Sequence, residues 1–170
     1  MNKWIYIMIL FLGITGCSKE MTSSQNVSST QETTIMDTPA FYVYDGDGNK
    51  ISLQNINNSV IINFWASWCP GCQEEMDSFQ KAFENNKDIS FMMVNVTDGD
   101  METKESALHY MEEKKYTFPI YFDQDGSAVR AFEIDAIPVT VCIDKSGDIH
   151  AIYYGGISDE KLQNEIKNLK

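Results

Sequence analysis

The feature that most constrains the fold is an apolar run, Val60–Ala66, that leads almost directly into the motif Cys69-Pro70-Gly71-Cys72. The run has one polar member, Asn63, and this pattern is typical of a strand that is buried on both faces of a sheet. From Pro70 to about Phe83, apolar residues recur at the spacing of a helix. The motif is therefore expected where a central strand passes into a helix.

The chain from residue 39 onward continues to alternate between short apolar runs and segments with helical spacing. Strands are expected over 41–44, 50–53, 89–96, 117–122, 139–143 and 149–154, and further helices over 101–115, 127–132 and 159–169. Strands joined through helices pair in parallel, whereas hairpins around 45–49 and 144–148 join antiparallel neighbours. We therefore expect an α/β fold with a mixed central sheet, helices on both faces and an N-terminal β-hairpin.

Two expectations concern burial. In the helix expected after residue 101, Ala107, Leu108 and Met111 are predicted to face inward. Cys142 lies in the middle of an expected strand and is interpreted as a small buried hydrophobe. The alternative for Cys142 is a third redox-active thiol.

Length and charge limit the classes of function. The chain has 170 residues, enough for one domain with short extensions, and its 43% apolar content suffices for an ordinary core. The formal net charge of −12 would repel a phosphate backbone, so nucleic-acid binding is not expected. Its 4 cysteines are too few and too unevenly spaced for a disulfide-stapled mini-domain.

The N-terminus has the pattern of a secretion signal. Lys3 precedes an apolar run, Trp4–Ile14, which is shorter than the ~20 residues that a transmembrane helix needs. Ile14-Thr15-Gly16-Cys17 resembles the lipobox of bacterial lipoproteins, which implies cleavage before Cys17 and a lipid on its thiol. The alternative is a plain signal peptide, or an uncleaved anchor with a chance cysteine.

This interpretation divides the chain into three segments. Residues 1–16 are a signal peptide, residues 17–38 are a lipid-anchored flexible tether rich in polar residues, and residues 39–170 are the folded domain. The lipid would hold the protein, as an extracytoplasmic domain, at the outer face of the cytoplasmic membrane.

The Cys-x-x-Cys motif carries the candidate chemistry. A thiolate is the reactive form of cysteine, and a helix N-terminus stabilises it through its dipole and its unpaired N–H groups. Cys69 is expected at this position, with Pro70 as the first helical residue. Cys72 lies about one turn later, so its sulfur returns beside Cys69. Cys69 would attack a substrate disulfide and Cys72 would resolve the resulting mixed disulfide.

Two other interpretations of the motif compete with this one. A zinc site needs two further ligands, but Cys142 is single, and His109 and His150 fall in unrelated elements. A purely structural disulfide across so short a loop would remove little entropy from the unfolded chain. No metal and no cofactor are therefore expected.

Several motifs in order resemble the thioredoxin superfamily, and most closely its TlpA/ResA-type membrane-tethered thiol–disulfide oxidoreductases. The resemblance covers about residues 41–169 and rests on residues 63–72, Glu75, 116–119, 137–140 and 143–147. It implies a thioredoxin-like domain over 39–170, with an insert of strand and helix at about 98–122.

The resemblance also assigns substrate-binding residues. Residue type alone leaves open whether Pro138 has a cis bond or is an ordinary edge proline. The resemblance implies that Pro138 is cis and faces the dithiol, and that Ile137 offers backbone hydrogen bonds to an extended substrate segment. Trp68 is expected at the rim of the active site, beside Pro70, whereas Trp65 is expected in the core.

Glu75 is a third candidate catalytic residue. It resembles the acidic residue that membrane-tethered relatives carry after the dithiol, and it lies about one helical turn past Cys72. Asn63 stands where many thioredoxins have a buried Asp that accepts a proton. The amide side chain of Asn63 does not accept a proton in this way. Our hypothesis is that Glu75 tunes or deprotonates Cys72. The alternative is a solvated carboxylate on the helix surface.

Three functions compete for this site. The first is a reductase for exported dithiols, such as apocytochrome c during cytochrome c maturation or a methionine sulfoxide reductase, with electrons from a CcdA-type membrane donor. The second is an oxidase that forms disulfides, and the third is a non-catalytic metal- or copper-delivery module. Pro70-Gly71 lacks the His that strongly oxidising relatives carry between their cysteines. The resemblance and the missing His together favour a disulfide reductase that acts on protein dithiols and disulfides, and a monomer is expected.

Overall fold

The computed structural model describes residues 36–53 and 57–170. The predicted signal peptide, Cys17 and residues 17–35 of the predicted tether lie outside the described residues. Within the part of the chain that is described, no helix is both long enough and apolar enough to cross a membrane.

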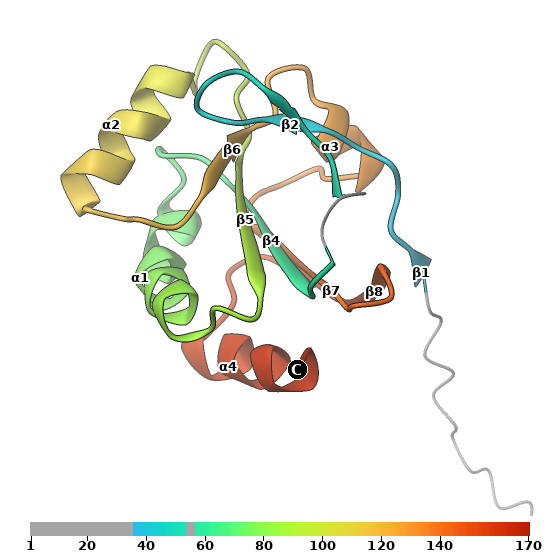
Figure 1. Ribbon diagram of the computed structural model, residues 1–170. Coiled ribbons are helices and arrows are strands. Elements are labelled where there is room, and N and C mark those ends of the chain that lie inside the picture. The colour runs from blue at the N-terminus through green and yellow to red at the C-terminus, as the bar shows by residue number, and fades with distance from the viewer. Residues whose placement is uncertain (1–35, 54–56) are drawn as a thin grey trace, which may run out of the picture. The chain divides into compact units, whose positions relative to one another are not determined.

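The strands of the described region form one sheet in the order β1-β8-β7-β4-β5-β6-β2-β3 (Figure 1). Their bounds are β1 Met36–Asp37, β2 Val43–Tyr44, β3 Lys50–Ile51, β4 Val60–Trp65, β5 Ser90–Asn95, β6 Ile120–Phe122, β7 Val139–Ile143 and β8 Asp148–Tyr154. β4 pairs in parallel with β5 and antiparallel with β7. The predicted mixed sheet is confirmed, and β4 lies near its centre.

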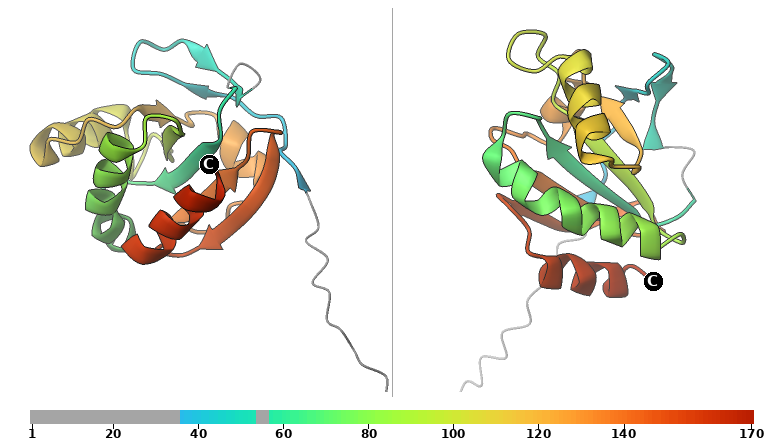
Figure 2. Two further views of the ribbon diagram at one scale, coloured as in Figure 1. Left: turned by 60° about the horizontal axis from the view of Figure 1, so that its bottom comes forward. Right: turned by 90° about the vertical axis from the view of Figure 1, so that its left-hand side faces the viewer.

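The helices cover both faces of this sheet, as predicted. Their bounds are α1 Pro70–Asn85, α2 Lys104–Lys114, α3 Ser127–Ala131 and α4 Asp159–Asn168. Figures 1 and 2 show α1 and α4 on one face of the sheet and α3 on the other. The side chains of α1 and α4 share one hydrophobic cluster, which α2 joins through Ala107 and Met111, whereas α3 contributes Ala128 to a second cluster.

The continuous apolar run of β4 has a simple structural reason. Ile61 and Trp65 point into the cluster beneath α1, and Ile62 and Phe64 point into the cluster beneath α3. Because side chains alternate between the two faces of a strand, a strand covered on both faces needs apolar residues at nearly every position. The strand thereby fixes the point at which the chain enters α1.

The structure differs from the sequence expectations at α2. Leu108 was predicted to face inward but is 40% exposed. The helix begins at Lys104 because Thr103 caps it, and its buried face consists of Ala107, Tyr110 and Met111. These three positions follow the spacing of one helix face, and Leu108 lies beside that face rather than on it.

Strand boundaries differ as well: β2 and β3 are shorter than expected, and the larger differences are at β1 and β6. Met36–Asp37, which the sequence placed at the end of the tether, pairs with β8 as β1, so the folded region begins before residue 39. The strand expected over 117–122 is shortened to β6. The N–H groups of Thr117 and Phe118 bond instead to the Gln80 side chain on α1, which removes them from the ladder.

Candidate active site

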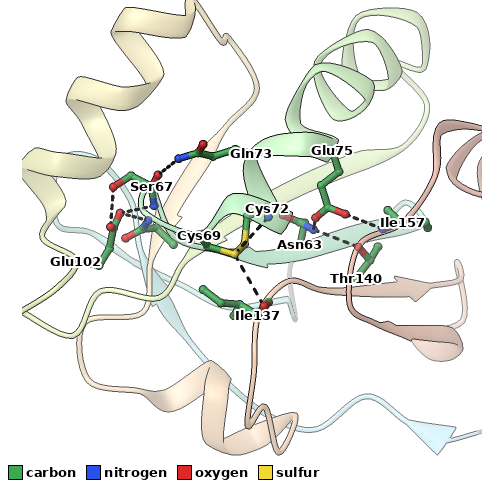
Figure 3. The surroundings of a disulfide bond; sticks show 11 residues. Asn63, Ser67, Cys69, Cys72, Gln73, Glu75, Glu102, Ile137, Thr140 and Ile157 are labelled. Atoms are coloured by element: carbon green, nitrogen blue, oxygen red, sulfur yellow. Dashed lines mark hydrogen bonds between the residues drawn. A yellow bond between two sulfur atoms is a disulfide. The ribbon is translucent and has the colours of Figure 1, made fainter.

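Cys69 and Cys72 lie at the junction between β4 and α1, and they are joined by a disulfide (Figure 3). Cys69 is the N-cap residue of α1 and Pro70 occupies the first turn. The backbone N–H of Cys72 donates to Cys69 Sγ at 3.2 Å. The sulfur of Cys69 therefore sits at the positive end of the helix dipole, where a thiolate is stabilised.

The segment before β7 lies against this dithiol. The Ile137–Pro138 peptide bond is cis, and the Ile137 carbonyl oxygen is 3.9 Å from Cys69 Sγ. A Cβ atom on Gly71 would come within 3.6 Å of the Pro138 ring, so this segment also packs against the first turn of α1. The structure thus brings Ile137 and Pro138 to the dithiol, as the sequence resemblance implied.

Glu75 is buried on the same helix, with 3% of its surface exposed. Its Oε1 accepts a hydrogen bond from Asn63 Nδ2 at 2.8 Å, and its Oε2 accepts one from the Ile157 N–H at 2.7 Å. Asn63 Nδ2 donates also to Thr140 Oγ1. The alternative interpretation of Glu75 as a solvated carboxylate is therefore wrong.

This environment changes the acidity of Glu75. Burial raises the pKa of the Glu75 carboxyl, and the hydrogen bonds from Ile157 and Asn63 offset part of that rise. A carboxylate with a raised pKa is a stronger proton acceptor than an exposed one. The side chain is thus suited to acid–base chemistry near the dithiol.

A second buried carboxylate, Glu102, was missed by the sequence reasoning. Its side chain accepts hydrogen bonds from the Ser67 N–H at 3.1 Å, the Ser67 hydroxyl at 2.7 Å and Asn95 Nδ2 at 2.7 Å. Gln73 Nε2 bonds to the Ser67 carbonyl oxygen from the other side. The turn that precedes Cys69 is therefore held at Ser67 by the mid-domain insert and by α1. A single Glu in a polar loop gives no periodic or motif signal in the sequence.

An apolar groove adjoins the dithiol. Trp68 is 46% exposed at its edge, and Val129, Ile134, Ala136 and Ile137 supply further apolar lining. Such an exposed apolar groove beside a reactive group is a common form of recognition site.

The remaining sequence interpretations concern residues outside this centre. Trp65 is fully buried, as expected for a core residue. Cys142 is buried too, and burial together with the nearby Glu165 carboxylate raises the pKa of its thiol to about 12. It is therefore an unreactive core residue. Across residues 36–53 and 57–170, no cluster of three His, Cys, Asp or Glu side chains is arranged to hold a metal ion.

Comparison with known proteins agrees with this geometry. Residues 36–152 match the AhpC/TSA family. The chain is 29% identical to sporulation thiol-disulfide oxidoreductase A of Bacillus subtilis over 118 residues, which cover 69% of this chain and 72% of that protein. It is 27% identical to the thiol-disulfide oxidoreductase ResA of Geobacillus kaustophilus, over 78% of this chain and 75% of that one.

A solved structure extends the likeness to three dimensions. The crystal structure of StoA from Bacillus subtilis superposes with a TM-score of 0.66 at 25% identity, over 75% of this chain and 96% of that one. The fold is therefore the thioredoxin-like fold that the sequence implied. The chain belongs to the AhpC/TSA family and is a thiol–disulfide oxidoreductase of the ResA and StoA type.

Proposed function

We propose that this protein is an extracytoplasmic disulfide reductase that transfers electrons from the Cys69–Cys72 dithiol to protein disulfides. The observation that carries the proposal is the position of Cys69 Sγ at the start of α1, where the Cys72 N–H donates to it. An anion at this point is stabilised, and a second sulfur lies one turn away.

The reaction then proceeds in two displacements. The reduced Cys69 thiolate attacks one sulfur of the substrate disulfide and releases the other as a thiolate, which takes up a proton from solvent. Cys72 loses its proton and attacks Cys69 Sγ, which breaks the mixed disulfide and frees the second substrate thiolate. Two electrons pass to the substrate, and the protein is left with the Cys69–Cys72 disulfide.

Glu75 is the proposed acceptor of the Cys72 proton. Its carboxylate is buried one helical turn from Cys72, and its two oxygens are oriented by Asn63 and Ile157. Because burial raises the pKa of Glu75, the carboxylate is a better base for a thiol than an exposed glutamate.

The substrate segment would bind next to the dithiol in an extended form. Ile137 lies against Cys69 Sγ and is placed to offer backbone hydrogen bonds to such a segment, with Pro138 shaping the approach. Trp68 and Pro70 would contact the substrate from the side of α1, and the apolar groove beside Trp68 would take a neighbouring apolar side chain.

Location and partners are also part of the proposal. The short apolar run before Ile14-Thr15-Gly16-Cys17 supports a lipid on Cys17, which would hold a monomeric domain at the outer face of the cytoplasmic membrane. As a thiol–disulfide oxidoreductase the protein acts on protein thiols. A CcdA-type membrane protein would return electrons to it, and the haem-binding cysteines of apocytochrome c would be a suitable substrate.

The first prediction separates the roles of the two cysteines. With insulin as the disulfide substrate, Cys72→Ala should accumulate a mixed disulfide through Cys69, because the resolving thiol is absent. Cys69→Ala should form no such adduct, and both variants should lose the catalysed reduction of insulin when dithiothreitol is supplied as the electron source. Non-reducing electrophoresis and intact mass measure the adduct. Cys142→Ala, which removes the buried third thiol, should keep wild-type turnover. The assignment would be contradicted if Cys69→Ala formed an adduct through Cys72 as fast as Cys72→Ala forms one through Cys69.

The second prediction concerns Glu75. Glu75→Gln should slow resolution of the mixed disulfide by about 10²-fold, because an amide does not accept the Cys72 proton. In the wild type the rate should fall as the pH drops through the raised pKa of Glu75, since the protonated carboxyl no longer accepts a proton. This fall of the rate at low pH, the acidic limb of the pH–rate profile, should be absent in Glu75→Gln.

Stopped-flow measurement of resolution across pH tests this prediction. Glu84→Gln is the matched control, because Glu84 is an exposed carboxylate farther along the same helix. If Glu75→Gln retains the wild-type rate and pH profile, Glu75 is not the proton acceptor.

The third prediction tests the direction of electron flow. Equilibration of the dithiol with glutathione redox buffers should give a reduction potential below about −200 mV, in the range of reducing thioredoxin-type proteins. Pro70-Gly71 supplies no imidazolium to stabilise the reduced form and so raise the potential. A value of about −120 mV, as for a strong oxidant, would instead make the protein a disulfide-forming oxidase.

A further inference from the structure

A crevice lies between the first turns of α1 and the segment that joins β8 to α4. Gly71 and Glu75 line it on the helix side, and Gly156 and Ile157 line it on the other side. Figure 3 shows the Glu75 side chain reaching from α1 toward Ile157, at this boundary. The crevice is distinct from the apolar groove beside Trp68, which contains neither Glu75 nor Gly156.

The buried Glu75 carboxylate borders this crevice. On its inner side Glu75 meets Asn63, which is itself fully buried and bonded to Thr140. On its outer side Oε2 accepts the Ile157 N–H and faces the lining of the crevice. The crevice therefore borders the carboxylate on the side of Gly156.

Gly156 keeps this approach open. A Cβ atom at this position would stand 3.8 Å from Glu75 Oε2 and 3.8 Å from the Gly71 carbonyl oxygen, directly at the carboxylate. The preceding Gly155 has φ of +83°, which explains a glycine there, but Gly156 is not in the left-handed region. The backbone therefore does not require glycine at 156, and the free space beside Glu75 Oε2 is the consequence of having one.

We propose that the crevice beside Gly156 is the route by which protons pass between Glu75 and solvent in each catalytic cycle. The inference rests on the proposed role of Glu75 as the acceptor of the Cys72 proton. When Cys72 is deprotonated and closes the disulfide, one proton is left on Glu75. That proton must leave before Glu75 accepts another, and it passes from Oε2 to water in the crevice. No electron moves in this step.

The charges around the carboxylate suit such a route. The two other titratable side chains that line the crevice are the carboxylates Glu74 and Asp159, which attract protons and protonated buffer molecules toward its mouth. The group that faces Glu75 from β4 is the neutral Asn63, which donates in turn to Thr140 on β7, and Cys72 lies on the same helix as Glu75. Among the lining residues there is no basic side chain that would hold Glu75 permanently ionised.

The test fills the crevice in two steps, with Gly156→Ala and Gly156→Val. Gly156 is not in the left-handed region of φ, and a Cβ atom there makes ordinary van der Waals contacts, so alanine fits and valine adds two methyl groups beyond it. Excluding water from Oε2 disfavours the charged form, so the pKa of Glu75 should rise by about one unit in Gly156→Val and by less in Gly156→Ala. The acidic limb of the resolution rate should move to higher pH by the same amount.

Carbon-13 NMR of the labelled Glu75 carboxyl measures the titration independently of activity. Gly46→Val is the matched control, because a Cβ at Gly46 meets nothing within 4 Å and the residue lies in the distant β2–β3 turn. Thermal unfolding shows whether each variant is folded, and Gly156→Ala carries the test if the valine variant is not.

An unchanged Glu75 titration in folded Gly156→Val or Gly156→Ala would overturn the route. A rate that falls equally at every pH, with no shift of the titration, would overturn it as well, because the side chain would then obstruct the substrate rather than the proton. Failure of the underlying function is separate: it would appear as an unchanged resolution rate in Glu75→Gln, whatever the Gly156 variants do.

Discussion

The hydrogen bond from the Cys72 N–H to Cys69 Sγ is the interaction on which the rest of the site depends. It exists because Cys69 is the residue that caps α1, so its sulfur faces the N–H groups that the first helical turn leaves unpaired. A sulfur in this position is a stabilised leaving group and a stabilised nucleophile. Thiol–disulfide exchange uses both properties, in alternate halves of the cycle.

The surrounding structure holds this sulfur in place with groups that are themselves buried. β4 is covered on both faces and therefore sets where α1 begins. Glu102 fixes Ser67 in the turn between them, and the segment at Ile137 closes over the sulfur from β7. In the mechanism we propose, Glu75 is the base behind the dithiol; burial raises its pKa, so it holds a proton at a higher pH than an exposed carboxylate. Burial thus both fixes the position of the Cys69 sulfur and raises the pKa of Glu75.

Local patterns in the sequence predicted much of this arrangement. The apolar run of β4, the helical spacing of α1 and the Cys-x-x-Cys motif are contiguous signals, and they located the dithiol at the strand–helix junction. Glu102 and the crevice beside Gly156 are formed by segments that meet only in the folded chain. Local sequence patterns therefore do not predict either feature. Leu108 was placed wrongly because the burial of one helix face depends on where that helix packs. The partner of Glu75, the Ile157 N–H, is a backbone group and leaves no residue-type signal.

All of the chemistry above requires that the start of α1 stabilise the sulfur of Cys69 as an anion. The most direct measurement is a pH titration of thiolate absorbance at 240 nm in the reduced protein, with the Cys69→Ala titration subtracted. Cys142 stays protonated over this range, because burial raises its pKa to about 12. We predict that Cys69 titrates at least one pH unit below the value of about 8.5 for a free cysteine. A midpoint at or above about 8.5 would contradict it, since the helix would then contribute nothing to the reactive sulfur.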